Sequence, residues 1–398
     1  MKDLTQLVTA GRDPERFDGM VNTPVFRGST ILHSTLADWE AKKKRRAADE
    51  HGASTYGRFG TPTHHALEEA VAALEGGYRS WLYPSGLAAI STALTALLKA
   101  GDHVLLTDSA YSPTRSFLTR VLGRFGVEVT VYDPSLGASV ASQLKPNTKV
   151  VYVESPGSET FEIQDIPAIA KAAHAHGAYV VMDNTWGTPL HFKPFKHGVD
   201  VSIQAATKYL VGHSDAMLGI VTCTKELWPA IKSTSQDLGQ TAGPEECYLA
   251  LRGIRTLAVR LRQHAESAIA VAQWLESRPE IEAVLHPALP SHPGHELWKR
   301  DFTGSCGLFA AVMKPVSPEA FTAFVDALQY FGIGVSWGGF ESLIIPFNPK
   351  GDRSTYQWPY EGQAFRLHVG LEDTDDLIAD LRQGLDALAE ARKCSKAA

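Results

Sequence analysis

From Thr61 onward, two patterns of apolar residues take turns along the chain. Short continuous apolar runs predict buried strands, and longer stretches with an apolar residue every three or four positions predict amphipathic helices. Such alternation is typical of a mostly parallel sheet with helices on both faces, and continuous apolar strands fit a sheet that is covered on both sides. The expected strands are residues 80–83, 103–107, 127–132, 150–154, 179–182, 199–204 and 219–223, and the expected helices are residues 64–74, 87–99, 113–125 and 167–176.

A long amphipathic stretch, residues 244–277 with an interruption at Gly253, follows this region and predicts the connection to a second, smaller unit. That unit mixes strands with helices and is therefore α+β. Residues 1–60 show no clear period and predict an irregular arm. The expected strands of the second unit are residues 307–313, 332–336 and 364–369, and its expected helices are residues 318–330 and 374–391. The sequence thus predicts three parts: an arm (1–60), an α/β domain (61–255) and an α+β domain (256–398).

Composition and charge exclude several classes of protein. The net charge of −6 over 398 residues argues against a general binder of nucleic-acid backbones. No apolar run reaches the roughly 18 residues of a membrane span, and the first residues lack the apolar stretch of a signal peptide. The four cysteines show no C-x-x-C spacing, which excludes a disulfide scaffold and a zinc knuckle. A cytoplasmic protein fits these observations best.

Two clusters of charged or titratable residues have plain interpretations. The basic run at residues 42–46 is expected to be a solvated helix face, because the chain is acidic overall and no aromatic residues interleave with the run. The pair His64-His65 lacks the i,i+4 spacing of helical metal ligands, so we interpret these residues as surface or hydrogen-bonded histidines. The sequence therefore predicts no metal site.

Candidate chemistry falls at the carboxyl ends of the predicted strands, where open α/β sheets bind their ligands. The small residues Pro84-Ser85-Gly86-Leu87 follow a strand and open a helix. Free backbone N–H groups and the helix dipole suit this position to a phosphate. Taken alone, a tight turn explains the same pattern more often, because the segment is neither G-x-G-x-x-G nor a Walker loop.

Three charged residues lie near the ends of other strands. Asp183 follows the strand at 179–182, Lys208 follows residues 201–207, and Arg366 lies in a short strand near the C-terminus. Each has an ordinary explanation alone: a loop cap, a surface lysine and a structural ion pair. Together with the anion site they supply what pyridoxal phosphate and an amino-acid substrate need. Lys208 would form the imine, Asp183 would pair with the ring nitrogen, and Arg366 would bind a carboxylate.

Longer motifs then point to a family. Residues 183–186 (DNTW) and 201–215 (VSIQAATKYLVGHSD) resemble the signature of the cysteine/methionine-metabolism enzymes that use pyridoxal 5'-phosphate. The resemblance extends over nearly the whole chain and implies pyridoxal-phosphate fold type I with a smaller C-terminal domain. Within the family, the chain is most similar to the bacterial β-lyases. Further matching blocks are residues 7–12, 154–158 (ESPGS), 295–304 (HELWKRDFTG), 336–343 (SWGGFESL) and 370–373.

The resemblance implies further residues around the cofactor, beside Lys208 and Asp183. Tyr111 should stack on the pyridine ring. The phosphate should be bound by the backbone of Gly86 and Leu87, by the side chain of Thr207, and by Tyr56 and Arg58 of a neighbouring subunit. The family usually has a hydroxyl two residues before that threonine, whereas this chain has Ala205, which can cost one hydrogen bond to the phosphate. Lys208, Tyr111 and Tyr56 are the implied catalytic residues.

The implied activity is β-elimination of L-cystathionine to homocysteine, pyruvate and ammonia, a step of methionine biosynthesis. Lys208 would remove the proton on Cα and then protonate the departing sulfur. Ser336 and Arg366 would hold the α-carboxylate of the substrate. Trp337 stands where the γ-acting relatives commonly have leucine, which favours the β-lyase branch. A site shared between subunits requires at least a dimer, and the family suggests a homotetramer of two such dimers.

Other activities stay open at this point. A γ-lyase or γ-synthase of the same family would give 2-oxobutyrate or join substrates at Cγ, and a β-lyase could prefer other cysteine S-conjugates. A member that binds the cofactor without turnover is disfavoured by the presence of Lys208, Tyr111 and Arg366. A nicotinamide-binding domain is disfavoured because no G-x-G-x-x-G follows a predicted strand.

Overall fold

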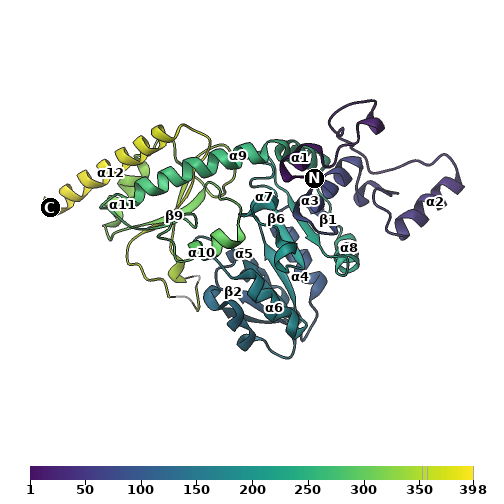
Figure 1. The fold of residues 1–398 in the computed structure, drawn as a ribbon, viewed down its shortest axis with the longest axis horizontal. Helices are drawn as coiled ribbons and strands as arrows, with labels where there is room; N and C mark the ends of the chain where they lie inside the picture. The colour runs from purple at the N-terminus through teal and green to yellow at the C-terminus, as the bar shows by residue number, and fades with distance from the viewer. Residues whose placement is uncertain (352, 356, 398) are drawn as a thin grey trace.

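The computed structural model of the chain describes residues 1–351, 353–355 and 357–397. In this part of the chain, two β-sheets are joined by one long helix, α9 (Pro244–Glu276), which runs along the top of Figure 1. The first sheet has seven strands in the order β1-β7-β6-β5-β4-β2-β3, and the second has five in the order β10-β11-β12-β9-β8. No helix within the described residues has both the length and the apolar character that a membrane crossing requires.

The first sheet is mostly parallel, as the alternating pattern predicts. Only β7 runs antiparallel to its neighbours, β1 and β6. The carboxyl ends of the other six strands therefore lie along one edge. The strands are β1 (Arg79–Tyr83), β2 (His103–Thr107), β3 (Glu128–Tyr132), β4 (Thr148–Glu154), β5 (Tyr179–Asp183), β6 (Val201–Ala205) and β7 (Gly219–Cys223).

Helices cover both faces of this sheet because successive side chains of a strand point to opposite sides. Val151 and Val153 of β4 pack into one core with α3, α6 and α9, whereas Val150 and Tyr152 pack into a second core with α4, α5 and α8. The fully buried strands explain why their sequences read as continuous apolar runs. The helices are α3 (Pro62–Glu75), α4 (Gly86–Leu97), α5 (Ser112–Arg120), α6 (Ile166–His176), α7 (Thr188–His191) and α8 (Trp228–Asp237), with 3₁₀ turns at Leu122–Phe125, Pro134–Gln143 and Pro194–His197.

The second unit is α+β, with its own core between the smaller sheet and helices α11 and α12. Phe324 of α11 packs against Phe365 of β12, with ring centroids 5.5 Å apart. Two strands here, β8 and β11, were not predicted, and β10 is shorter than expected. The elements are β8 (Ile281–Leu285), α10 (His295–Asp301), β9 (Leu308–Met313), α11 (Pro318–Asp326), β10 (Gly332–Ile333), β11 (Leu343–Phe347), a 3₁₀ turn at Pro349–Gly351, β12 (Ala364–His368) and α12 (Thr374–Ala397).

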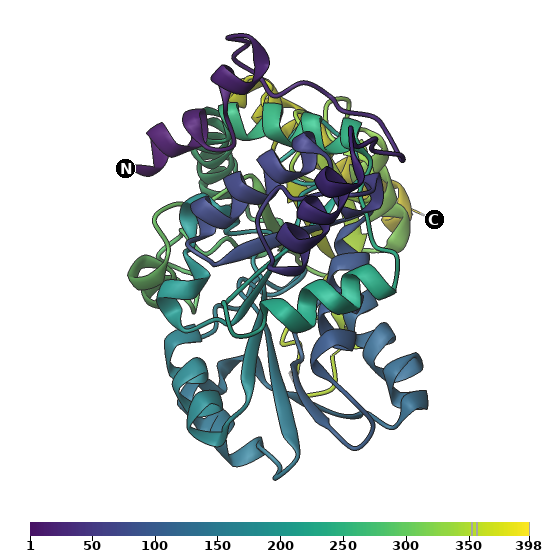
Figure 2. The ribbon, with the colours of Figure 1, turned by 90° about the vertical axis from the view of Figure 1, so that its right-hand side faces the viewer.

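The N-terminal region is more regular than expected. It contains two helices, α1 (Asp3–Thr9) and α2 (Leu36–Ala47), together with 3₁₀ turns at Pro14–Phe17 and Gly57–Phe59. The expectation of an irregular arm is wrong at α2 because Thr35 caps this helix: its Oγ1 accepts a hydrogen bond from Asp38 N at 3.1 Å. No residue of α2 is buried, which confirms the basic run as a solvated helix face. The part of the arm that contains α2 stands away from the body in Figure 1, and Figure 2 views this part from its tip.

The expected interruption of the long helix at Gly253 is also wrong, because α9 continues through it. A Cβ atom at this position would lie 2.2 Å from Leu210 O and 2.4 Å from Val211 O. Glycine therefore serves close packing of α9 against the segment that follows Lys208, and not a break. The expected domain boundary at residues 255/256 lies inside this unbroken helix.

We expect Gly253→Ala to destabilise the protein, because the new methyl group must push backbone away from backbone. Overpacking of this kind costs about 1–3 kcal/mol, which outweighs the roughly 1 kcal/mol that alanine gains over glycine in a helix. Urea unfolding monitored by circular dichroism measures the difference. Arg252→Ala, at an exposed position of the same helix, is the control and should change the free energy of unfolding by about 0.5 kcal/mol or less. A Gly253→Ala protein as stable as the unmodified one would contradict this account.

Candidate active site

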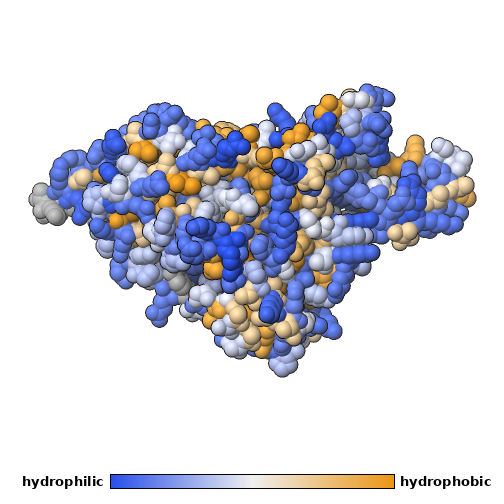
Figure 3. All heavy atoms as spheres, in the orientation of Figure 1, coloured by the Kyte–Doolittle hydropathy of each residue, from blue (hydrophilic) through white to orange (hydrophobic). Residues whose placement is uncertain are grey.

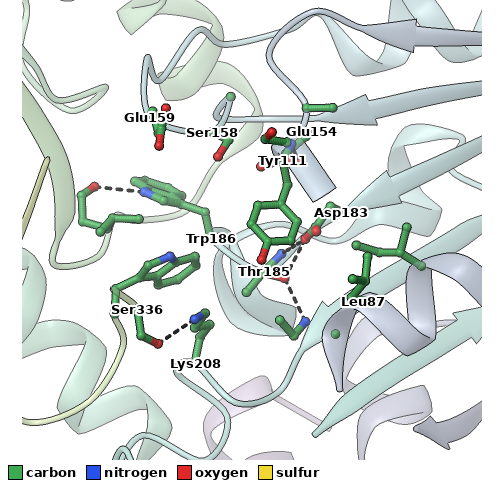
Figure 4. Close-up of a pocket in the computed structure, with 18 of the residues that line it drawn as sticks. Leu87, Tyr111, Glu154, Ser158, Glu159, Asp183, Thr185, Trp186, Lys208 and Ser336 are labelled. Carbon is green, nitrogen blue, oxygen red and sulfur yellow. Dashed lines mark hydrogen bonds between the residues drawn. The ribbon is translucent and has the colours of Figure 1, made fainter. Parts of the chain in front are cut away.

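A cavity of about 510 Å³ lies at the carboxyl edge of the first sheet, where the second unit closes over it. Residues at the ends of β4, β5 and β6 line one side, and residues next to β10 and in β12 line the other. Figure 4 shows Lys208 and Ser336 pointing toward one another across the cavity, with Tyr111, Asp183 and Thr185 gathered nearby. Nine of the eleven predicted site residues line it: Gly86, Leu87, Tyr111, Asp183, Thr207, Lys208, Ser336, Trp337 and Arg366.

The start of α4 forms the expected anion site. Ser85 caps the helix, with its Oγ accepting a hydrogen bond from Ala88 N at 3.1 Å. The first-turn N–H groups at Gly86 and Leu87 have no partner within the helix, and both residues line the cavity. A Cβ atom at Gly86 would lie 2.7 Å from the Cβ of Ala205. The tight approach of these two backbones therefore depends on small side chains at both positions.

Asp183 is held at the end of β5 by its neighbour Thr185. Its Oδ1 accepts hydrogen bonds from Thr185 N at 3.0 Å and Thr185 Oγ1 at 2.5 Å. Thr185 Oγ1 also accepts from Ala205 N of β6 at 2.9 Å, so the carboxylate is tied to two strands. Burial raises the pKa of Asp183, and the nearby Lys208 opposes this shift. A cationic group in the cavity would stabilise the ionised carboxylate.

A second carboxylate, the half-buried Glu154, lies beside Asp183 and had no predicted role. The two residues are register partners at the ends of β4 and β5. Burial and the adjacent Asp183 hold the pKa of Glu154 well above its usual value. Its Oε2 accepts a hydrogen bond from Tyr111 N at 2.7 Å, which fixes the backbone at the start of α5. Glu154 thus positions Tyr111, and its place at a strand end was the signal that could have revealed it.

Lys208 lies three residues beyond the end of β6 and lines the cavity. Nζ donates a hydrogen bond to Ser336 Oγ at 2.6 Å and lies 5.5 Å from the centre of the Trp337 ring. Burial and the positive charge of Arg366 lower the pKa of Lys208 to about 8, although Asp183 acts in the opposite direction. A sizeable fraction of the amine is therefore neutral near physiological pH, as a nucleophile or proton acceptor requires.

Arg366 extends from β12 toward the same amine. One of its terminal nitrogens donates to the backbone oxygen of Ser336 at 3.2 Å, whereas the Lys208 amine donates to the side-chain oxygen of the same residue. Ser336 has a backbone φ of +127°, a conformation that costs of order 1–3 kcal/mol in a residue other than glycine. Next to it, Gly338 lets the turn pack against the Lys208 backbone, where a Cβ atom would lie 2.8 Å from Lys208 C.

Tyr56 and Arg58 lie outside the cavity of their own chain. The Arg58 guanidinium donates to Gln236 O at 2.6 Å, and Tyr56 is 44% exposed. The prediction that these two residues complete the site of a neighbouring subunit stays a prediction.

The segment between β11 and β12 also reaches the cavity, although no pattern along the chain predicts this. Arg353 lines the cavity and donates to Asp108 O at 2.6 Å and Thr160 Oγ1 at 2.7 Å. The buried carboxylate of Asp108 accepts from the backbone N–H groups of Ser354 and Thr355. These contacts join residues about 245 positions apart, so no local pattern could indicate them.

The donor set of the cavity fits pyridoxal phosphate. The start of α4 offers N–H groups to a phosphate, the buried Asp183 offers an anion to a protonated ring nitrogen, and Lys208 offers a partly neutral amine to an aldehyde. The side chain of Thr207 lines the same end, and its Oγ1 accepts from Leu218 N at 2.9 Å.

Comparison with known proteins agrees with this fit. The family model of Cys/Met metabolism PLP-dependent enzymes matches residues 4–386. The chain belongs to this family. It is 45% identical to cystathionine beta-lyase MetC of Escherichia coli, covering 96% of this chain and 97% of the relative. It is 42% identical to an L-alanine/L-glutamate racemase of Wolbachia pipientis, with 98% of both chains covered. A solved structure of metB from Corynebacterium glutamicum superposes with a TM-score of 0.89 at 32% identity, covering 98% of both chains. The expected fold class and cofactor are confirmed.

We expect the Lys208 amine of the cofactor-free protein to titrate near pH 8, whereas an unperturbed lysine titrates near about 10.4. Between these values the folded state binds fewer protons than the unfolded chain, so stability should rise with pH across this window. The pH dependence of acylation at Lys208, followed by peptide mass spectrometry, measures the midpoint.

The variant Arg366→Met is the control for this titration. Removing the guanidinium takes away one cause of the lowered pKa, so the midpoint should move upward while burial keeps it below the ordinary value. A midpoint near pH 10 in the unmodified protein would show that Lys208 is hydrated like a surface lysine.

Proposed function

We propose that the protein catalyses β-elimination of L-cystathionine to homocysteine, pyruvate and ammonia. The observation that carries this proposal is the contact of the Lys208 amine with Ser336, directly beside the Arg366 guanidinium. It places a proton acceptor next to a carboxylate receptor, which is where Cα of a bound amino acid would lie. The similarity to cystathionine beta-lyase MetC supports the choice of substrate and reaction.

Pyridoxal phosphate, when bound, supplies the electron sink for the pair of electrons left on Cα. Gly86, Leu87 and Thr207 would bind its phosphate, and Tyr111 and Asp183 would contact its ring. The ionised Asp183 would keep the ring nitrogen protonated, since an opposite charge within about 4–6 Å favours the charged form. Thr185 maintains the aspartate in this orientation through two hydrogen bonds.

Arg366 orients the substrate. Its planar guanidinium can bind the α-carboxylate through two parallel hydrogen bonds, which a lysine could not do. The neighbouring Ser336 offers its hydroxyl to the same carboxylate once Lys208 has moved away from it. Trp337 packs against Tyr209, with ring centroids 5.5 Å apart, and forms an apolar wall that limits access of water. Cα is thereby held close to the amine.

Lys208 moves the protons of the reaction. Its neutral Nζ accepts the proton from Cα, and the electron pair of the broken C–H bond then expels the sulfur from Cβ. The resulting ammonium returns that proton to the departing thiolate, which leaves as homocysteine. Water hydrolyses the remaining three-carbon fragment to pyruvate and ammonia. A positioned acid–base group of this kind contributes about 10²–10⁴-fold to the rate.

Racemisation of an amino acid is a second candidate, because a relative of similar identity is named L-alanine/L-glutamate racemase. Racemisation also begins with removal of the Cα proton, but the proton returns to the opposite face of Cα. Tyr111, which lies in the same cavity as Lys208, is the group that could deliver it. The products distinguish the two reactions.

We further propose that residues 1–60 form an arm that completes the site of a neighbouring subunit with Tyr56 and Arg58. Exposed apolar side chains on the arm support this contact with a neighbour: Leu32 is 88% exposed and Leu36 is 72% exposed. Apolar atoms lie among hydrophilic ones on the projecting arm in Figure 3. The assembly would be at least a dimer, with a tetramer of two dimers as the complete form. Residues 61–255 would form the cofactor-binding domain and residues 256–398 the C-terminal domain.

The buried cysteines fit a reducing compartment. Cys223, Cys247 and Cys306 are free thiols in the described structure. We therefore place the reaction in the cytoplasm.

We expect the purified holoenzyme to convert L-cystathionine into equal amounts of pyruvate and homocysteine. Pyruvate is measured with lactate dehydrogenase, and the thiol with a chromogenic disulfide. Lys208→Ala should lose about 10²–10⁴-fold of this rate or more, and should no longer retain pyridoxal phosphate covalently after borohydride reduction. 2-Oxobutyrate as the main product would assign a γ-elimination instead, and D-amino acids formed from L-alanine without pyruvate would assign racemisation.

We expect Arg366→Ala to weaken substrate binding by about 2–5 kcal/mol, because it leaves the α-carboxylate without its partner in a desolvated site. Steady-state kinetics should show mainly a rise in KM, while covalent retention of pyridoxal phosphate stays unchanged. Arg366→Lys keeps the charge without the planar fork and should lie between the two. An unchanged KM in Arg366→Ala would remove this residue from the substrate site.

A further inference from the structure

A second group of side chains, His51, His65 and Glu68, lies outside the active-site cavity. One ligand atom of each lies within 4.8 Å of those of the other two. His65 Nδ1 lies 3.0 Å from Glu68 Oε2, and the His51 and His65 rings meet edge to face with centroids 5.3 Å apart. In a tetrahedral metal site with bonds of about 2.0–2.2 Å, ligand atoms lie roughly 3.3–3.6 Å apart. His51 is the exposed member of the group.

The fold brings these three residues together from two places in the chain. His65 and Glu68 lie one turn apart on the same face of α3. His51 belongs to the turn that follows α2, where Asp49 has φ +58° and Gly52 has φ +77°. The neighbouring His64 does not belong to the group, because both of its ring nitrogens have other partners: Nδ1 lies 2.8 Å from Thr61 Oγ1 and Nε2 lies 2.9 Å from Ala242 O.

Two polar atoms at this place are suited to a positive ion. Glu68 is buried on α3, where its carboxylate Oε2 lies 3.0 Å from His65 Nδ1. The Nε2 atom of His65 is buried with no hydrogen-bond partner among the described residues. All three side chains line a cavity of about 40 Å³, enough for an ion with one water molecule.

The neighbouring cations Arg46, Arg79 and Lys232 all contact groups other than the three proposed ligands. Asp49 pairs with Arg79 at 2.8 Å and with Lys232. The Arg46 guanidinium stacks on the Phe59 ring at 3.4 Å from its centre. The charge that remains facing the cavity from α3 is the carboxylate of Glu68.

We propose that His51, His65 and Glu68 bind one divalent zinc ion, with a water molecule as the fourth ligand. Two imidazoles and one carboxylate form a ligand set that zinc accepts in tetrahedral geometry. The ion joins the turn after α2 to α3, and this turn leads directly into Tyr56-Gly57-Arg58. Its role is to fix the base of the arm, so the proposal does not depend on which reaction the cavity catalyses.

The test uses the holoenzyme, treated with a chelator and then dialysed. Isothermal titration with Zn²⁺ should show one ion bound per chain, and Co²⁺ should give the visible absorption bands of a tetrahedral site. His51→Gln removes an exposed ligand without disturbing the core and should weaken Zn²⁺ binding by about 100-fold or more. Crystals soaked in ZnCl₂ should show an anomalous peak between the three side chains.

His176→Gln is the matched control, because His176 is also exposed but lies on α6, where its ring contacts Lys145 O. This variant should bind Zn²⁺ like the unmodified protein. Glu68→Gln keeps the hydrogen-bonding shape of the buried side chain while removing its charge, and should also lose binding. Less than one ion per chain in the unmodified protein, or equal affinity in His51→Gln, would overturn the proposal; since neither readout measures turnover, such a failure leaves the β-elimination proposal untouched.

Discussion

The structure of the active site depends on keeping an amine and a carboxylate out of water at neighbouring strand ends. Lys208 and Asp183 both pay a desolvation cost, which lowers the pKa of the amine and raises that of the acid. The second unit contributes Ser336 and Trp337 to the surroundings of the Lys208 amine. The hydrogen bond from Lys208 to Ser336 joins the two units at this point. Burial disfavours the charged form of each side chain, and for Lys208 this means an amine that is more often neutral and therefore reactive.

The pair of carboxylates at the ends of β4 and β5 shows how the fold separates two roles. Asp183 receives two hydrogen bonds from Thr185, which favour its ionised form. Glu154 receives one from the backbone of Tyr111, and burial and the adjacent Asp183 raise its pKa. Two adjacent buried negative charges would repel strongly in a medium of low polarity. Asp183 therefore has hydrogen bonds that support its charged form, while Glu154 holds the backbone of Tyr111 in place.

Local sequence patterns predicted those features of the fold and the site that depend on neighbouring residues in the chain. The strands of the first sheet and the positions of Asp183 and Lys208 followed from apolar runs and strand ends, since burial on both faces imposes those runs. The predicted helix interruption at Gly253 was wrong because the sequence around this glycine does not distinguish a helix break from a close contact with Leu210 O. The attachment of Arg353 to Asp108 O could not be predicted, because such a contact exists only once distant segments have folded together.

The group formed by His51, His65 and Glu68 likewise exists only because two separate segments of the chain fold together. Spacing along α3 indicated no site, since the third ligand comes from a turn fourteen residues before His65. That turn leads into Tyr56 and Arg58, which must point away from their own chain if they are to serve a neighbour. An arm with little buried surface of its own needs a fixed base to hold such a direction. A metal ion would provide this fixed base with only three side chains, in place of the apolar core that the arm lacks.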